Sequence, residues 1–120
     1  MATRTPVLQD ALLDQKLYTW TGLLNGDDGA GGPHVGSGDR TVQVFGTLGV
    51  GGTIIFEGSL DGGTNWFPLR DPSSTAISFT AAGGRAILEN VALVRPRVTG
   101  GDGTTSLTAI LMTRRTGSGF

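Results

Sequence analysis

The 120-residue sequence contains no cysteine, only one histidine and one lysine, and no long apolar run. Without cysteine, neither a disulfide nor a thiolate metal site can stabilise the fold. No stretch approaches the roughly 20 apolar residues of a membrane span. The first ten residues lack the apolar core of a secretion signal. We therefore expect a protein made inside a cell, with no membrane partner.

Charge is sparse and balanced, with nine basic and ten acidic residues spread along the chain. Affinity for nucleic acid depends largely on neutralising phosphates with a basic surface. Anionic membrane surfaces attract clusters of basic residues in the same way. The scattered arginines form no such cluster, so we expect neither nucleic acid nor a membrane surface as a partner.

The residues for catalysis are also scarce. His34 lies in a glycine-rich stretch, and a catalytic base must be held rigidly beside its nucleophile. The oxygen-rich segments 25–29 and 61–65 lack the spacing of a calcium loop, and Asp or Asn beside Gly mainly forms turns. Glycine runs at 49–52 and 100–103 lack the Lys-Ser/Thr of a phosphate-binding loop. We therefore expect no enzyme, no catalytic residue, no metal and no cofactor.

What the sequence does contain is a β-strand pattern, which is clearest between residues 41 and 66. Val42 and Val44 alternate with polar residues, and Ile54, Phe56 and Leu60 continue the same two-residue period. Such alternation is typical of a half-buried strand. Asp61-Gly62-Gly63 favours a tight hairpin, because glycine readily adopts positive φ.

Similar short segments follow nearly to the C-terminus, separated by turns rich in Gly, Asp, Pro and Ser. This pattern predicts an all-β fold, an antiparallel β-sandwich that is jelly-roll-like or immunoglobulin-like. The expected strands are 16–24, 41–48, 53–60, 65–69, 76–80, 86–91, 93–99 and 105–113, with a loop over 25–39.

We predict a single domain with two extensions. Residues 1–16 form an N-terminal arm, either ordered and extended or with a short helix at Gln9–Lys16. Residues 17–115 form the sandwich, and 116–120 a C-terminal tail.

Proline at position 96 interrupts an apparent strand, and it cannot donate a ladder hydrogen bond. The strand is therefore expected at a sheet edge or at a bulge. Arg95 and Arg97 point to one face, where they either protect the edge or bind carboxylates of a partner. Trp66 is expected in the core, whereas Trp20 fits either the core or a platform for stacking on sugar.

Several motifs in this order resemble a family of small virion proteins of tailed bacteriophages. Together the matching segments span about residues 17–115. They are Trp20–Leu23, Asn25–Gly29, Thr41–Val44, Gly46-Thr47, Glu57–Gly62, Thr64–Trp66 and Arg95–Thr104.

The resemblance implies a head-decoration or cement protein, a β-sandwich that assembles as a homo-oligomer on the capsid exterior. Its implied partners are the major capsid protein and further copies of itself, as a dimer or trimer. Its implied location is the virion, after assembly in the host cytoplasm. A tail or neck component of the virion would have the same sequence features.

The candidate contact residues come from exposed apolar positions and from the two arginines. Ile110 and Met112 lie opposite the expected core residues, so they form a subunit interface unless a second sheet covers them. Phe120 either enters a neighbour's pocket or belongs to a frayed tail. The full set is Leu8, Leu12, Leu13, Arg95, Arg97, Ile110, Met112 and Phe120.

The hairpin Ser59–Trp66 is also similar to a signature of discoidin-type, galactose-binding sandwich domains. That likeness covers about ten residues. It supports an alternative function as a carbohydrate-binding module, in which Trp20 is the candidate sugar platform.

Overall fold

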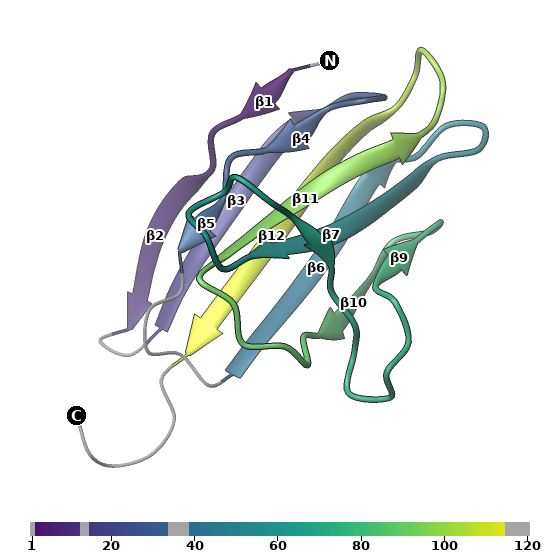
Figure 1. Ribbon diagram of the computed structural model, residues 1–120. Coiled ribbons are helices and arrows are strands. Elements are labelled where there is room, and N and C mark those ends of the chain that lie inside the picture. Colours follow the sequence, from purple (N-terminus) through teal and green to yellow (C-terminus); the bar gives the residue numbers. More distant parts are fainter. Residues whose placement is uncertain (1, 13–14, 34–38, 115–120) are drawn as a thin grey trace, which may run out of the picture.

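The computed structural model describes residues 2–12, 15–33 and 39–114, which form two stacked β-sheets (Figure 1). These residues include no helix, and so none that could cross a membrane. The predicted all-β, jelly-roll-like antiparallel sandwich is confirmed. The strands are β1 (Thr3–Arg4), β2 (Val7–Leu12), β3 (Gln15–Leu23), β4 (Asp28–Gly29), β5 (Gly32–Pro33), β6 (Asp39–Thr47), β7 (Thr53–Ser59), β8 (Phe67–Pro68), β9 (Ser78–Phe79), β10 (Gly83–Ala86), β11 (Leu93–Gly100) and β12 (Ser106–Arg114).

One sheet has seven strands and the other has five. In the seven-stranded sheet the order is β1-β4-β11-β7-β8, with β5 also pairing with β11 and β9 with β7. In the five-stranded sheet the order is β10-β6-β12-β3-β2, so β12 is its central strand. All these pairings are antiparallel except that of β1 with β4.

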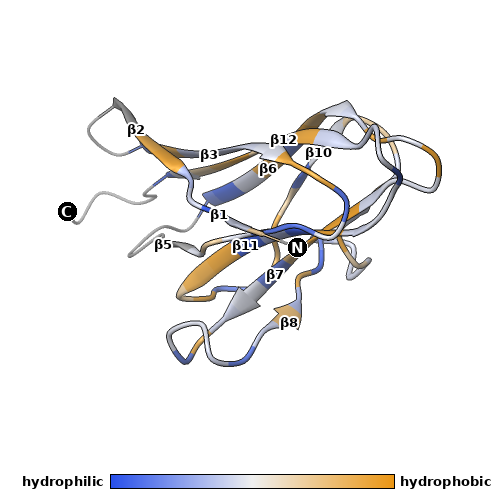
Figure 2. Cartoon of the chain, turned by 90° about the horizontal axis from the view of Figure 1, so that it is seen from above, coloured by the Kyte–Doolittle hydropathy of each residue, from blue (hydrophilic) through white to orange (hydrophobic). Residues whose placement is uncertain are grey.

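The hydrophobic core lies between the two sheets, which Figure 2 shows as an upper and a lower layer. The inward residues predicted from the alternation, Val42 and Val44 in β6 and Ile54 and Phe56 in β7, are all buried. Leu60 was expected to continue this row, but it is 68% exposed because β7 ends at Ser59. The other core residues are Tyr18, Trp20, Leu23, Leu69, Ile77, Phe79, Ile87, Val91, Val94, Val98, Leu107, Ala109 and Leu111.

A bulge in β3 explains why both faces of this strand carry apolar residues in the sequence. Trp20 pairs with Ala109 and Leu23 with Leu107, so β3 holds one more residue than β12 over this interval. Gly22 lies in the bulge with φ 65°, a conformation that glycine adopts at little cost. The extra residue shifts the alternation, and as a result Trp20 and Leu23 both face the core.

Over residues 2–12 the N-terminal arm is ordered and extended, and the helix alternative for Gln9–Lys16 is wrong, because its described residues belong to β2 and β3. In place of a helix, β2 pairs with β3 in the five-stranded sheet. Strand β1 pairs with β4 in the seven-stranded sheet. Residues 3–12 thus pass from one sheet to the other.

Two further expectations are corrected. The predicted loop 25–39 contains two short strands, β4 and β5, that pair with β11. The predicted strand 86–91 is wrong, because β10 pairs with β6 over Gly83–Ala86 and the chain then leaves the sheet. Residues 34–38, with His34, and 115–120 lie outside the described residues.

Pro96 lies inside a sheet, so the expected edge position is wrong. Strand β11 pairs with β7 on one side and with β4 and β5 on the other. The amide of Val98 donates to Asp27 O at 2.8 Å on the β4 side. Because amide directions alternate along a strand, the nitrogen of Pro96 points to the same side, between the pairs Val94↔Gly32 and Arg97↔Asp28. The register shift of β11 falls between Val98 and Gly100 instead.

Strand β4 approaches the core very closely at Gly29. A methyl group built there would lie 2.5 Å from Trp20 Nε1 and 2.6 Å from Pro96 Cδ. We expect Gly29→Ala to lower the free energy of unfolding by about 2–3 kcal/mol, because the indole and the proline ring must both shift. Urea denaturation of the original chain and the variant measures this change in the free energy of unfolding.

The matched control is Gly103→Ala, because a methyl group at Gly103 meets nothing within 4 Å. Its stability should stay within about 0.5 kcal/mol of the original. Equal stability of both variants would contradict the close packing of β4.

Candidate functional site

The hairpin after β7 is a turn stabilised by its own polar groups. The Asp61 carboxylate accepts hydrogen bonds from the Asn65 amide at 2.9 Å, the Asn65 side chain at 2.7 Å and the Ser59 hydroxyl at 2.8 Å. The Ser59 hydroxyl accepts one from Gly63 N at 2.9 Å. Gly62 and Gly63 have φ of 79° and 97°, as the sequence predicted for this turn. The Ser-Leu-Asp-Gly-Gly-Thr-Asn-Trp motif is therefore a local scaffold.

This scaffold places Trp66 on the outer side of the seven-stranded sheet. The indole Nε1 donates to Gly63 O at 3.0 Å. The guanidinium carbon of Arg95 lies 4.2 Å from the ring centre, within cation–π distance. Trp66 is half-buried and is not part of the core. Its expected core position is therefore wrong.

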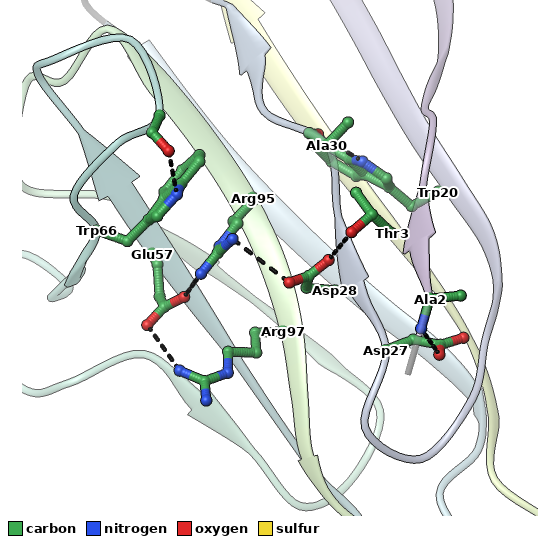
Figure 3. Close-up of polar contacts among 11 residues, drawn as sticks. Ala2, Thr3, Trp20, Asp27, Asp28, Ala30, Glu57, Trp66, Arg95 and Arg97 are labelled. Atoms are coloured by element: carbon green, nitrogen blue, oxygen red, sulfur yellow. Dashed lines mark hydrogen bonds and ion pairs between the residues drawn. The ribbon is translucent and has the colours of Figure 1, made fainter.

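Beside Trp66, charged side chains from three strands meet (Figure 3). Arg95 donates to Glu57 Oε1 through Nε at 3.0 Å and Nη2 at 2.8 Å, and lies 3.4 Å from Asp28 Oδ2. Arg97 reaches Glu57 Oε2 at 3.4 Å. Thr3 donates to the other oxygen of Asp28 at 2.7 Å. We call Asp28, Glu57, Trp66, Arg95 and Arg97 the charged cluster.

The charged cluster decides between the two interpretations of the arginines. Edge protection is wrong, because β11 is not an edge strand. Arg95 is 17% exposed and is bound within the chain, whereas Arg97 is 50% exposed and makes one contact at the limit of hydrogen-bond length. Arg97 therefore remains the better candidate for contact with a partner.

Sequence reasoning missed the two carboxylates of this cluster. Glu57 has no neighbour of opposite charge along the chain, and Asp28 was assigned to a loop. The register pairs Glu57 with Arg95 and Arg97 with Asp28 across neighbouring strands. Residues directly opposite each other share a face of the sheet, so the contacts follow from strand order and register.

Asp27, next to the cluster, fastens the N-terminal segment to the sandwich. Its carboxylate accepts from Leu24 N at 2.9 Å, Ala2 N at 2.8 Å and Arg4 Nε at 3.1 Å. Burial alone would raise the pKa of Asp27, but the hydrogen bonds and the Arg4 charge together lower it. The carboxylate oxygens of Asp27 and Asp28 thus have protein donors. No group of three or more His, Asp or Glu that could hold a metal occurs in the described ranges.

Ile110 and Met112 lie on the opposite side of the molecule, on the outer face of the five-stranded sheet. They alternate along β12 with the buried residues Ala109 and Leu111. The seven-stranded sheet packs on the other side and therefore does not cover them. We call this surface the uncharged face. Its outward residues are Val7, Leu17, Thr19, Thr41, Gln43, Phe45, Thr108, Ile110 and Met112.

The remaining predicted residues do not join these two surfaces. Trp20 is fully buried and donates to Ala30 O at 2.9 Å, so the prediction of a sugar platform at Trp20 is wrong. Leu8 pairs with Tyr18 and thus shares the core side of its sheet, at the edge, where it is 52% exposed. The backbone of Leu12 ends β2, but its side chain lies outside the description, as do Leu13 and Phe120.

Removing Glu57 should destabilise the protein strongly. Glu57 is only 6% exposed, and Glu57→Leu would leave Arg95 without its main partner in a poorly hydrated place. We expect the free energy of unfolding to fall by about 3 kcal/mol, as measured by chemical denaturation. The control is Asp39→Asn, which removes an exposed ion pair with Arg114 and should cost no more than about 1 kcal/mol. If both variants unfold at the same denaturant concentration, the charged cluster is not a structural support.

The hydrogen bonds of the hairpin predict a low pKa for Asp61. Donation by the Asn65 amide, the Asn65 side chain and the Ser59 hydroxyl lowers the pKa of Asp61 from 3.8 to about 2. Because the folded pKa is the lower one, the stabilisation is complete above the unfolded pKa and is lost as pH falls from about 4 through about 2. Carbon NMR titration of the Asp61 carboxyl should give this value. In Asn65→Ala the pKa should rise toward 3.8. Titration of the original protein near 3.8 would refute the hydrogen-bonded turn.

Comparison with known proteins shows the fold. No family model matches the chain, and no curated protein sequence matches it either. The SPBc2 prophage-derived protein YomS has a similar structure, with a TM-score of 0.61 and 11% identity over 88% of this chain and 98% of that one. At this identity the likeness shows a shared fold only.

Two further structures resemble the chain more distantly. Protein NMB1881 from Neisseria meningitidis has a TM-score of 0.44 and 11% identity, over 91% of this chain and 81% of that one. Peruvianin-I, a cysteine peptidase from Thevetia peruviana latex, has a TM-score of 0.45 and 14% identity, over 86% of this chain and 52% of that one. Likenesses at these scores carry no argument. The described chain is a β-sandwich with the same fold as a prophage-derived protein.

Proposed function

We propose that this chain is a structural protein of a bacteriophage particle. In this proposal it binds the major capsid protein on the outside of the head as a homo-oligomer, and it stabilises the head without catalysing a reaction. It would be made and assembled in the host cytoplasm and would end up on the capsid exterior.

The observation that supports this proposal most directly is the fold shared with a prophage-derived protein over nearly the whole of that protein. The motifs that resemble small virion proteins support the same origin. In the structure, three groups of these motifs are placed as follows: Glu57–Gly62 and Thr64–Trp66 lie at the end of β7 and in the hairpin after it, Asn25–Gly29 contains β4, and Arg95–Thr104 covers β11 from Arg95 onward and the turn that follows.

The structure is also physically suited to this task. A sandwich whose two outer faces differ, one uncharged and one bearing Arg97, can contact two kinds of neighbour at once. Contacts made by many copies around a capsid shell act together. Each contact can therefore be weak while the shell gains considerable resistance to bursting. Arg97 is half-exposed and contacts Glu57 through Nη1 alone, so its other N–H groups can bind a carboxylate of the capsid through two parallel hydrogen bonds.

Capsids that lack decoration test the proposal. Purified chain added to such capsids should co-sediment with them and raise the temperature at which they release DNA. Arg97→Ala should weaken co-sedimentation by about tenfold, because a charged contact contributes on the order of 1–1.5 kcal/mol. Sedimentation combined with a DNA-binding dye measures both effects.

The matched control is Arg114→Ala. Arg114 has nearly the same exposure, 52%, but belongs to the other sheet. It should bind capsids like the original chain. Absence of co-sedimentation together with an unchanged DNA-release temperature would refute the cement function. Binding to tails or necks instead of heads, seen by electron microscopy of labelled protein, would favour the tail or neck alternative.

One observation favours the carbohydrate-binding alternative. Trp66 is half-buried beside charged groups on an outer face, and indole rings there can stack on sugar. A glycan array comparing the original chain with Trp66→Ala tests this alternative. Signals that disappear in Trp66→Ala would support it, and no signal from the original chain would exclude it for the glycans on the array.

A further inference from the structure

The uncharged face is the outer surface of a β-sheet, and its centre is apolar. Ile110 occupies the central strand, between Gln43 of β6 and Thr19 of β3. Met112 pairs with Leu17 on one side, and Phe45, which is 43% exposed, pairs with Thr108. Three of the four polar residues of the face are threonines: Thr19, Thr41 and Thr108. Threonine and isoleucine are β-branched, so they present methyl groups and lose little side-chain freedom when covered.

Charge is absent from the middle of this face and balanced at its rim. None of its nine defining residues is charged. At one end Asp39 and Arg114 continue the outward rows of β6 and β12, and they bind each other at 2.8 Å. A face that must meet its own copy across a two-fold axis is best without net charge, because like charges would otherwise be brought together.

The edges of the same sheet are poorly suited to pairing. At one edge the register of β2 against β3 shifts between Asp10 and Leu12. At the other edge β10 has four residues and begins with two glycines. Short or irregular edge strands are devices by which proteins avoid adding another strand. A neighbour therefore docks more readily on the face of this sheet than along its side.

The size of the face matches a self-association surface. By register, β3, β6 and β12 carry three to five outward positions each, and the edge strands β2 and β10 carry one or two. At about 4.8 by 6.7 Å for each position, the whole outer face of this sheet covers roughly 500 Å². Two such footprints, one on each copy, come to about 1,000 Å², which is the area that a specific protein interface should reach. Sheets that pack face to face in this way also form the interior of sandwich domains.

We propose that a second copy of this chain covers the uncharged face, so that two five-stranded sheets pack against each other about a two-fold axis. The proposal deepens the proposed function, because it names the surface through which copies of the decoration protein associate. The dimer forms without any capsid. It leaves both charged clusters, with Arg97, on the outside of the pair.

The mass of the purified full chain in solution tests the dimer. Light scattering after size exclusion should give twice the 12.4 kDa chain mass at micromolar concentrations. Ile110→Lys puts two ammonium groups near the centre of the interface, and it should weaken dimerisation at least 100-fold, because juxtaposed like charges cost several kcal/mol. An equimolar mixture of Ile110→Lys and Ile110→Glu should recover dimers, which a merely misfolded variant would not do. Thr41→Lys provides a second, independent disruption.

The control is Thr99→Lys, an exposed position on β11 of the other sheet. It should remain dimeric. The proposal is overturned by a monomer of the original chain at 100 µM, or by a dimer that Ile110→Lys and Thr41→Lys weaken less than threefold.

The two proposals fail separately. A dimer that is disrupted as predicted but does not bind capsids would leave this inference intact and remove the cement function. A monomer that binds and stabilises capsids would do the opposite.

Discussion

The packing around Trp20 is the constraint on which the rest of the structure depends. Its indole comes from the five-stranded sheet, and its Nε1 donates to Ala30 O of the segment that pairs with the opposite sheet. Gly29 passes between this ring and Pro96 with no room for a side chain. One buried aromatic residue thus connects both sheets and sets the position of β4. Burying this ring removes a large apolar area from water, while its polar atom, the indole nitrogen, keeps a hydrogen-bond partner.

Much of the outer surface of the seven-stranded sheet follows from the position of β4. Asp27 and Asp28 lie at its start, where one fastens the N-terminal residues and the other contacts Arg95. Arg95 in turn lies over Trp66, which the Ser59–Trp66 hairpin holds from the other direction. The result is a pre-ordered charged surface in which Arg97 remains partly free to contact a neighbour. The outer surface of the five-stranded sheet is the uncharged face. The sandwich therefore has two chemically distinct sides.

Local features of the structure were predictable where a residue's environment depends on its near neighbours in the chain. Val42, Val44, Ile54 and Phe56 face the core as their alternation indicates, and the glycines of the hairpin adopt the positive φ that a tight turn requires. The outward direction of Ile110 and Met112 was predictable for the same reason. Predictions failed where a bulge or a sheet partner intervened. One case is Gly22, whose bulge moves Leu23 into the core, and another is Pro96, whose nitrogen faces the gap between β4 and β5.

The sequence by itself determined the all-β class, the positions of the main strands along the chain and the hairpin scaffold, because these depend on side-chain alternation and on turn residues a few positions apart. Only the tertiary structure decided which tryptophan is buried, which carboxylates meet the arginines, and that the N-terminal segment joins both sheets. Those outcomes depend on strand order and register, which bring together residues such as Asp28 and Arg95 that are 67 positions apart. A two-residue period specifies which face a side chain takes, but it carries no information about which strand lies beside it.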